Sequence, residues 1–211
     1  MKRFIKPLFF TICFIAFTIL VKTVDVQPVG PQGSLTGFSA LNTQIHQFLG
    51  TNAFCYTLTQ ILGVLAILTA AAFACTGLVQ LIKRKSLLKV DQNLLFLGLI
   101  YILVIILYIL FEKLAINYRP VVLEEGLEPS YPSTHTMLIL TIMGTGVRAM
   151  KGYIKNKTLL IILQIFFLTI SAVTVVCRLL SGVHWFTDII GGVQVSLAFI
   201  TLYQSLYKTQ E

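Results

Sequence analysis

The sequence predicts an all-α fold, a bundle of six membrane-spanning helices, and two observations support this. Of the 211 residues, 56% are hydrophobic and only 11% are charged, whereas about a quarter of the residues of a soluble domain are charged. The apolar residues also gather into stretches close to the length of about 20 residues that a helix needs to cross a bilayer. These stretches cover residues 4–22, 54–82, 93–114, 134–150, 158–180 and 187–206.

The first and fourth stretches need separate arguments. The first follows the basic start Met1-Lys2-Arg3, as a secretory signal would, but its end, TILVKTVDV, offers no small-residue cleavage site. We therefore expect it to be retained as a span. The fourth is the weakest of the six, because TMLILTIMGTGVRAM contains two glycines and an arginine.

The basic residues, which give the chain a net charge of +8, indicate its orientation in the membrane. Twelve of the sixteen lysines and arginines precede the first span or follow the second, fourth or sixth, so these twelve lie on one side. Because cytoplasmic loops carry such an excess of lysine and arginine, we predict a multi-pass protein of the cell membrane with both termini in the cytoplasm. Bilayer lipids, and not nucleic acid, are the expected partners of this charge. The residues are Lys2, Arg3, Lys6, Lys83, Arg84, Lys85, Lys89, Arg148, Lys151, Lys155, Lys157 and Lys208.

The segment between the first two spans is predicted to be external. It begins as a loop rich in proline and glycine, and apolar residues then recur at helical intervals, namely Phe38, Leu41, Ile45, Phe48 and Leu49. This spacing predicts a short helix lying in the membrane interface, and we interpret His46 as an interfacial residue rather than a catalytic one. No internal repeat is evident, so residues 1–211 are treated as one domain, and the oligomeric state stays open.

The four cysteines show neither CxxC spacing nor nearby clusters of histidine. They are therefore interpreted as small buried hydrophobic residues rather than as disulfides or metal ligands. They are Cys13, Cys55, Cys75 and Cys177.

The predicted orientation brings four helix ends to the external interface. The third span ends there, the fourth begins there, the fifth ends there and the sixth begins there. Ionisable residues at membrane depth are costly and usually mark a functional site, and these four ends carry three short motifs that contain them.

Two of the motifs flank the loop between the third and fourth spans. FEKLAINYRP places Lys113 and Arg119 beyond the third span, and the proline after Arg119 predicts a turn that lets both cations point at one place. The alternative is that both side chains extend to the membrane surface and contact lipid headgroups. SYPSTHTM opens the fourth span with Ser133, Thr134 and His135. A helix start suits a phosphate group; Ser133 as a plain cap is the alternative, but a cap does not require His135.

The third motif is CRLLSGVHWFTDII, in which Arg178 closes the fifth span and His184 and Asp188 open the sixth. A spacing of four residues places His184 and Asp188 on one helix face. A carboxylate there fixes the imidazole tautomer and makes the ring a better base or nucleophile. A structural ion pair is the alternative interpretation.

Taken in order, these three motifs closely resemble the signature of the type 2 phosphatidic acid phosphatase superfamily. The resemblance covers residues 113–188 by motif, and the six-span layout extends it to the whole chain. It implies an integral membrane enzyme of lipid metabolism, with its active site at the external interface, that dephosphorylates lipid phosphates or pyrophosphates without a metal or another cofactor.

The resemblance also implies the roles of the residues. His184 would be the nucleophile that forms a phosphohistidine, Asp188 its orienting partner, and His135 the acid that protonates the leaving group. Spacing alone shows only that His184 is the better nucleophile candidate. The residues expected to bind phosphate are Lys113, Arg119, Ser133, Thr134 and Arg178.

Two positions depart from the family pattern, which usually has glycine in place of Thr134 and serine in place of Cys177. Threonine keeps its backbone N–H, so phosphate binding survives unless that position needs a positive φ. Cysteine is a weaker hydrogen-bond partner than serine. Neither change removes a charged group or an imidazole, so we expect an active enzyme.

The substrate and the phosphoryl acceptor stay open. The short loops suggest a bacterial cell envelope, where undecaprenyl pyrophosphate and phosphatidylglycerol phosphate are favoured over phosphatidate. Transfer to another lipid instead of water is one alternative, and transport of an anion is another, although transport sites lie near the bilayer midplane. For the three acidic residues before the second motif, three interpretations are possible: they repel a highly charged lipid headgroup, they pair with the cations of the site, or they form a solvated loop. They are Glu124, Glu125 and Glu128.

Overall fold

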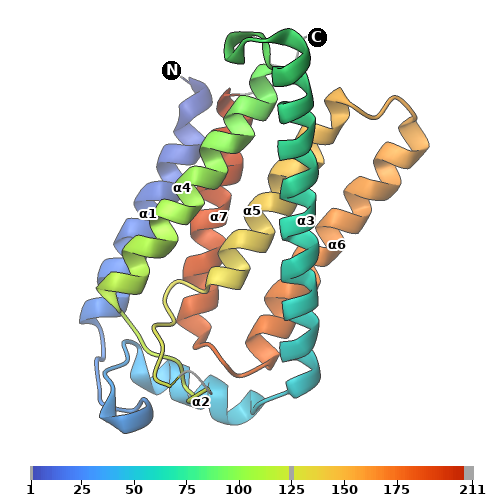
Figure 1. Cartoon of the computed structure of the whole chain (residues 1–211). Coiled ribbons are helices and arrows are strands. Elements are labelled where there is room, and N and C mark those ends of the chain that lie inside the picture. The colour runs from blue at the N-terminus through green and yellow to red at the C-terminus, as the bar shows by residue number, and fades with distance from the viewer. Residues whose placement is uncertain (1, 124–125, 207–211) are drawn as a thin grey trace.

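Seven α-helices form within residues 2–123 and 126–206, the part of the chain that this computed structural model describes (Figure 1). Short 3-10 turns at Lys2–Phe4, Pro31–Gly33, Leu87–Lys89 and Met150–Gly152 join some of them. The predicted all-α fold is therefore confirmed. The helices are α1 (Ile5–Thr23), α2 (Ser39–Leu49), α3 (Ala53–Arg84), α4 (Gln92–Leu114), α5 (Thr134–Ala149), α6 (Lys157–Leu180) and α7 (Phe186–Leu206).

Five of the described helices are long and apolar enough to cross a membrane: α1 with its preceding turn, α3, α4, α6 and α7. The predicted fourth span forms α5, which has only 16 residues, fewer than the roughly 20 of a typical span. Its place in the bundle explains its weak apolar character. It packs against α3, α4, α6 and α7, so its neighbours are protein side chains rather than lipid. That α5 is a sixth span stays a prediction.

The remaining long helices expose apolar side chains on the outside of the bundle. Ile61 and Leu68 of α3 and Ile162 and Ile165 of α6 are each more than half exposed, as expected of side chains that face lipid. The first helix is part of the bundle, because α1 packs along α7. At their far ends, Oγ of Ser205 donates to the carbonyl of Arg3 at 2.6 Å.

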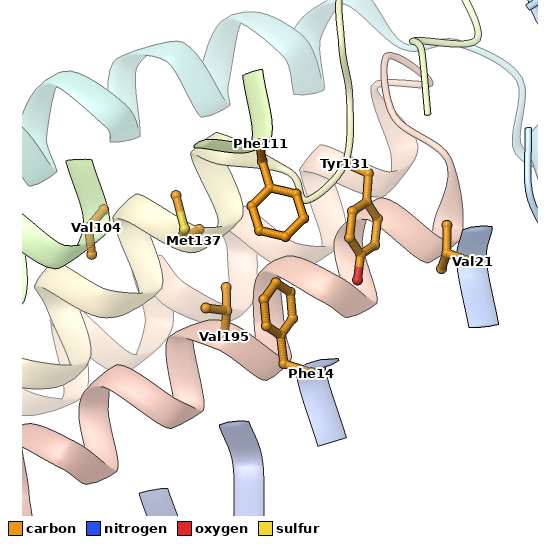
Figure 2. Packing of buried hydrophobic residues seen from close by; sticks show 7 residues of the cluster. All are labelled: Phe14, Val21, Val104, Phe111, Tyr131, Met137 and Val195. Carbon is orange, nitrogen blue, oxygen red and sulfur yellow. The ribbon is translucent and has the colours of Figure 1, made fainter. Parts of the chain in front are cut away.

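One hydrophobic cluster fixes the chain just before α5 (Figure 2). The rings of Phe14 and Tyr131 are parallel, with centroids 6.3 Å apart, and the Tyr131 hydroxyl lies 2.8 Å from Oγ1 of Thr18. Gly191 of α7 leaves room for this ring, because a Cβ there would lie 2.6 Å from it. The cluster anchors the segment that leads into α5. Its buried members are Phe14, Val21, Val104, Phe111, Tyr131, Met137 and Val195.

The predicted short helix after the first span forms as α2, which lies across the end of the bundle (Figure 1). The C-terminal ends of α4 and α6 and the N-terminal ends of α5 and α7 lie at this same end, while the N-terminal end of α1 and the C-terminal end of α7 lie at the other (Figure 1). The three motifs are therefore brought to one end of the bundle. Which face of the membrane this end occupies stays a prediction.

Candidate active site

His184 lies in the turn between α6 and α7 and is 3% exposed. Its Nε2 is 3.3 Å from a terminal nitrogen of Arg178. Because a guanidinium can only donate, Nε2 must be the acceptor, and the neutral ring then carries its proton on Nδ1. Nδ1 faces Oδ2 of Asp188 at 3.5 Å. The structure therefore assigns the tautomer that leaves a lone pair on Nε2, as a nucleophile requires.

Asp188 is fully buried, and each of its two carboxylate oxygens accepts a hydrogen bond. Oδ2 accepts from the backbone N–H of Trp185 at 2.9 Å, which is the acidic half of a capping box at the start of α7. Oδ1 accepts from Nδ2 of Asn117 at 3.2 Å. The 3.5 Å separation from His184 is long for a hydrogen bond, so the contact is chiefly electrostatic. His184 precedes α7, which begins at Phe186, so the prediction that both residues share a helix face is wrong, although their side chains do meet.

The environment of His184 keeps its ring neutral. Burial is the main cause, and the positive charge of Arg178 adds to it; together they hold the pKa of His184 well below its ordinary value of 6.5. The lone pair on Nε2 is therefore present at neutral pH.

Arg178 is held by α3, a helix that contributes to none of the three motifs. The residue is 1% exposed, and its guanidinium donates to Oγ1 of Thr59 at 3.1 Å and lies 5.6 Å from the centre of the Tyr56 ring. The sequence analysis did not identify either residue. The available signal was the polar composition of YTLTQ at the predicted outer end of an otherwise apolar span.

Ser133 acts as the cap of α5. Its hydroxyl oxygen accepts from Oγ1 of Thr136 at 3.0 Å and, more weakly, from the backbone N–H of Thr136 at 3.5 Å. Its own backbone N–H donates to the carbonyl of Asp188 at 3.0 Å. These contacts agree with the interpretation of Ser133 as a helix cap. They also join the start of α5 to the start of α7. Thr134, the first residue of α5, is not among the residues with positive φ, so this position does not need glycine.

Thr134, His135, Arg119 and Arg178 line one cavity of about 690 Å³. His135 and Arg119 both bear electrostatically on His184, so the structure gathers residues of all three motifs around this space. The cavity is lined by Tyr56, Gln60, Tyr108, Glu112, Arg119, Leu123, Glu128, Pro129, Thr134, His135 and Arg178.

Acidic residues balance the arginines in this cavity. Glu128 pairs with Arg119, with a terminal nitrogen 2.7 Å from Oε2, and the Arg119 backbone N–H donates to the Glu128 carbonyl at 3.0 Å. Among the three interpretations of the acidic residues, Glu128 therefore follows the second, in which it pairs with a cation of the site. Glu124 and Glu125 lie outside the described residues. Lys113 is exposed and does not line the cavity, whereas its neighbour Glu112 does, so a phosphate-binding role for Lys113 stays a prediction.

A second, apolar groove of about 290 Å³ adjoins the cavity and shares Gln60, Thr134 and His135 with it. It is otherwise lined by Gly63, Val64, Ile67 and Leu138. A Cβ at position 63 would stand 3.4 Å from Cδ2 of His135, so His135 lies where the polar and apolar spaces meet.

His46 and the cysteines lie outside the cavity. Nε2 of His46 is 3.0 Å from the carbonyl of Gly182, and its ring packs near that of Trp185 with centroids 5.5 Å apart, so α2 supports the turn that carries His184. All four cysteines, which the structure describes, are free; Cys55 is buried, Cys13 and Cys177 are half-buried, and Cys75 is exposed. The prediction of buried cysteines is therefore wrong for Cys75, which lies on an outer face of α3.

Comparison with known proteins supports what the motifs indicate. The structure is similar to a crystal structure described as that of the first transmembrane PAP2-type phosphatidylglycerolphosphate phosphatase from Bacillus subtilis, with a TM-score of 0.69, 15% sequence identity and 94% of each chain covered. At this identity the similarity shows the fold. No curated protein matches the sequence. The family model of the PAP2 superfamily, however, matches residues 93–211, more than half of the chain and all three motifs, and the protein therefore belongs to the PAP2 superfamily of membrane lipid phosphate phosphatases.

Proposed function

We propose that this phosphatase hydrolyses a lipid phosphomonoester without a metal, through a phosphohistidine formed on His184. The observation that carries the proposal is the neutral His184 whose Nε2 accepts from Arg178, beside a cavity lined by two arginines and His135. Phosphoryl transfer depends mainly on positioning and on charge stabilisation of the phosphoryl oxygens, and these groups supply both.

In the first step, Nε2 of His184 attacks phosphorus and the bond from phosphorus to the lipid oxygen breaks. His135 takes up a proton when the anionic phosphate binds beside it and gives this proton to that oxygen, so the lipid leaves as an alcohol. The imidazole becomes positively charged, and Asp188 stabilises this charge. The guanidinium of Arg178 turns from Nε2 to the phosphoryl oxygens, for which its fork of donors is well suited.

In the second step, water attacks phosphorus and the bond from phosphorus to Nε2 breaks. His135, now neutral, accepts a proton from the water. Inorganic phosphate leaves, and His184 returns to its neutral form. The roles of the two histidines come from the family resemblance, and the geometry supports them through the tautomer of His184 and the position of His135 where the polar cavity and the apolar groove meet.

The lining of the cavity bears on the choice of substrate. The apolar groove that begins at His135 suits the hydrocarbon chain of a lipid, whose phosphate would lie in the polar cavity. Glu112 and Glu128 face this cavity, and Glu128 already neutralises Arg119, so the site favours a phosphomonoester over a more highly charged pyrophosphate. Of the predicted substrates, we therefore propose phosphatidylglycerol phosphate, the substrate named for the similar Bacillus subtilis structure, ahead of undecaprenyl pyrophosphate.

The test is phosphate release by the purified full-length protein in detergent from phosphatidylglycerol phosphate, undecaprenyl pyrophosphate and phosphatidate, with EDTA present. We expect full activity in EDTA, the highest kcat/KM for phosphatidylglycerol phosphate, and loss of both turnover and an acid-labile phosphoenzyme in His184→Ala. Activity that returns only with added magnesium would refute the mechanism. A preference for undecaprenyl pyrophosphate would refute the substrate assignment alone.

A second comparison separates the two histidines. His135→Ala should slow hydrolysis of a lipid phosphate much more than that of p-nitrophenyl phosphate, whose leaving group scarcely needs an acid. If His135→Ala instead lost the phosphoenzyme while His184→Ala kept it, the two roles would be reversed.

A further inference from the structure

Asn117 connects Asp188 to the segment between α1 and α2. It lies in the link after α4 and is fully buried. Its Nδ2 donates to Oδ1 of Asp188 at 3.2 Å, and its Oδ1 accepts from the backbone N–H of Gly37 at 3.1 Å. A single side-chain amide therefore joins the carboxylate beside His184 to the backbone of residues 24–38, here called the α1–α2 segment.

Asn42 of α2 holds the other side of the same backbone. It is also fully buried, and its Nδ2 donates to the carbonyl of Gly37 at 2.8 Å and lies 2.9 Å from Oγ1 of Thr187. Its Oδ1 accepts from the backbone N–H of Thr187 at 3.2 Å. Thr187 is the second residue of α7, where a backbone N–H has no partner within the helix. Asn42 therefore caps α7 one residue before Asp188.

Gly37 is fixed between the two asparagines by its close approach to α1. A Cβ at this position would lie 1.6 Å from the carbonyl oxygen of Val21, so only glycine lets the backbone pass here. Both its N–H and its C=O are used in the network, and their position is set by the packing against α1.

The network determines which oxygen of Asp188 faces His184. Because Asn117 occupies Oδ1, Oδ2 is the oxygen left for the N–H of Trp185 and for Nδ1 of His184. A buried carboxylate needs such donors to stay charged and oriented. Gly37 and Asn42 also precede residues 93–211, which match the family, so this support comes from a part of the chain outside the matched region.

We propose that Asn117 is a positioning residue for the Asp188–His184 pair, and that the α1–α2 segment and α2 form part of the active site by holding it through Gly37 and Asn42. The inference rests on the proposed phosphohistidine mechanism, in which Asp188 orients and stabilises the His184 ring.

A double-mutant cycle in the full-length protein tests this coupling. Asn117→Leu removes the donor at similar volume, and a hydrogen bond to a charged group is worth about ten- to hundredfold in rate. We expect kcat to fall by about that factor while KM changes less than about threefold. In the Asp188→Asn background, the same substitution should lower kcat by less than about threefold, because the residue acts through the carboxylate.

Asn93→Leu is the matched control. Asn93 is a buried asparagine at the other end of α4, where its Oδ1 accepts from the Tyr153 hydroxyl at 3.0 Å. Its loss removes the same kind of group far from Asp188. It should leave kcat near the wild-type value in both backgrounds, even if the melting temperature falls.

Wild-type kcat in Asn117→Leu, or an equal loss in both backgrounds, would overturn the positioning role. If Asn117→Leu does not fold, Asn117→Asp keeps the shape, removes the donor and completes the same cycle. Asn42→Asp keeps the acceptor for Thr187 but loses the donor to Gly37, so kcat should fall several-fold, and an unchanged kcat would exclude α2 from the site. If the wild type releases no phosphate from any lipid, the proposed function fails. The same double-mutant cycle, measured by melting temperature instead of kcat, then still tests the coupling of Asn117 to Asp188.

Discussion

Thr59→Val should weaken catalysis although Thr59 lies outside all three motifs. Its hydroxyl accepts from the buried guanidinium of Arg178 at 3.1 Å, and valine has the same shape without the oxygen. A hydrogen bond to a charged group contributes about 1.5–3 kcal/mol, which corresponds to about ten- to hundredfold in rate. The Tyr56 ring, whose centre lies 5.6 Å from the guanidinium, retains part of this hold on Arg178. We therefore expect kcat/KM to fall by about tenfold, at the low end of the range.

Thr174→Val provides the matched control for this change. Thr174 is also fully buried, in α6, but its hydroxyl makes no hydrogen bond with any described residue. Replacing an unpaired buried hydroxyl with a methyl group is close to neutral or stabilising. The assay is phosphate release from phosphatidylglycerol phosphate in mixed micelles, with melting temperatures measured in parallel. Equal kcat/KM values for the two variants would refute the argument that Thr59 holds Arg178 in place.

Three further predictions concern pH, the groove and topology. Because the pKa of His184 is well below 6.5 in the folded protein, the unfolded chain takes up a proton first as pH falls below about 6.5, and stability drops by about 1.4 kcal/mol per pH unit until the folded pKa is reached. His184→Gln should therefore lose less melting temperature between pH 7.5 and 5 than the wild type, and an equal loss would contradict this. Gly63→Leu should slow hydrolysis of a long-chain lipid phosphate several-fold more than that of p-nitrophenyl phosphate, whereas Gly63→Ala, whose Cβ makes an ordinary 3.4 Å contact, should change neither; equal slowing of both substrates would argue against a chain in the groove. In an otherwise cysteine-free protein, a membrane-impermeant thiol reagent should label a cysteine at position 126 and miss one at 153, and the reverse would place the site on the cytoplasmic face.

The general architecture could be predicted because its signals are periodic or repeated. Apolar stretches of spanning length and basic residues on alternate loops depend on many residues at once, so single exceptions do not hide them. These two patterns also predicted that four helix ends meet, and the ends contain Arg119, His135, Arg178 and His184. In the structure the first three line one cavity, and His184 contacts Arg178 beside it.

The supporting contacts could not be predicted, because each is made by one polar residue whose partner is far away in the chain. Asn117 and Asp188 are 71 residues apart, and Thr59 and Arg178 are 119 residues apart. No spacing rule relates such pairs, since they meet only when the helices pack. The bounds of α5 were predicted closely, since the apolar stretch 134–150 becomes the helix Thr134–Ala149. Its position among α3, α4, α6 and α7 was not predicted, because it too depends on how the helices pack.

The opposite charges on the two sides of His184 suit both states that the proposed reaction requires. Before attack, Arg178 at Nε2 disfavours a charged ring, so the lone pair stays available. Once the phosphoryl group is attached, the ring is positive, and the same guanidinium next to it would be repelled unless it moved to the phosphoryl oxygens. Asp188 at Nδ1 then faces a full positive charge at 3.5 Å instead of a neutral ring, and the low dielectric of a buried site strengthens that attraction. Asp188 therefore interacts more strongly with the phosphorylated ring than with the free one, which is the differential stabilisation that speeds a reaction. A carboxylate free to rotate would lose part of it, so the restraint on Oδ1 matters most in the charged state.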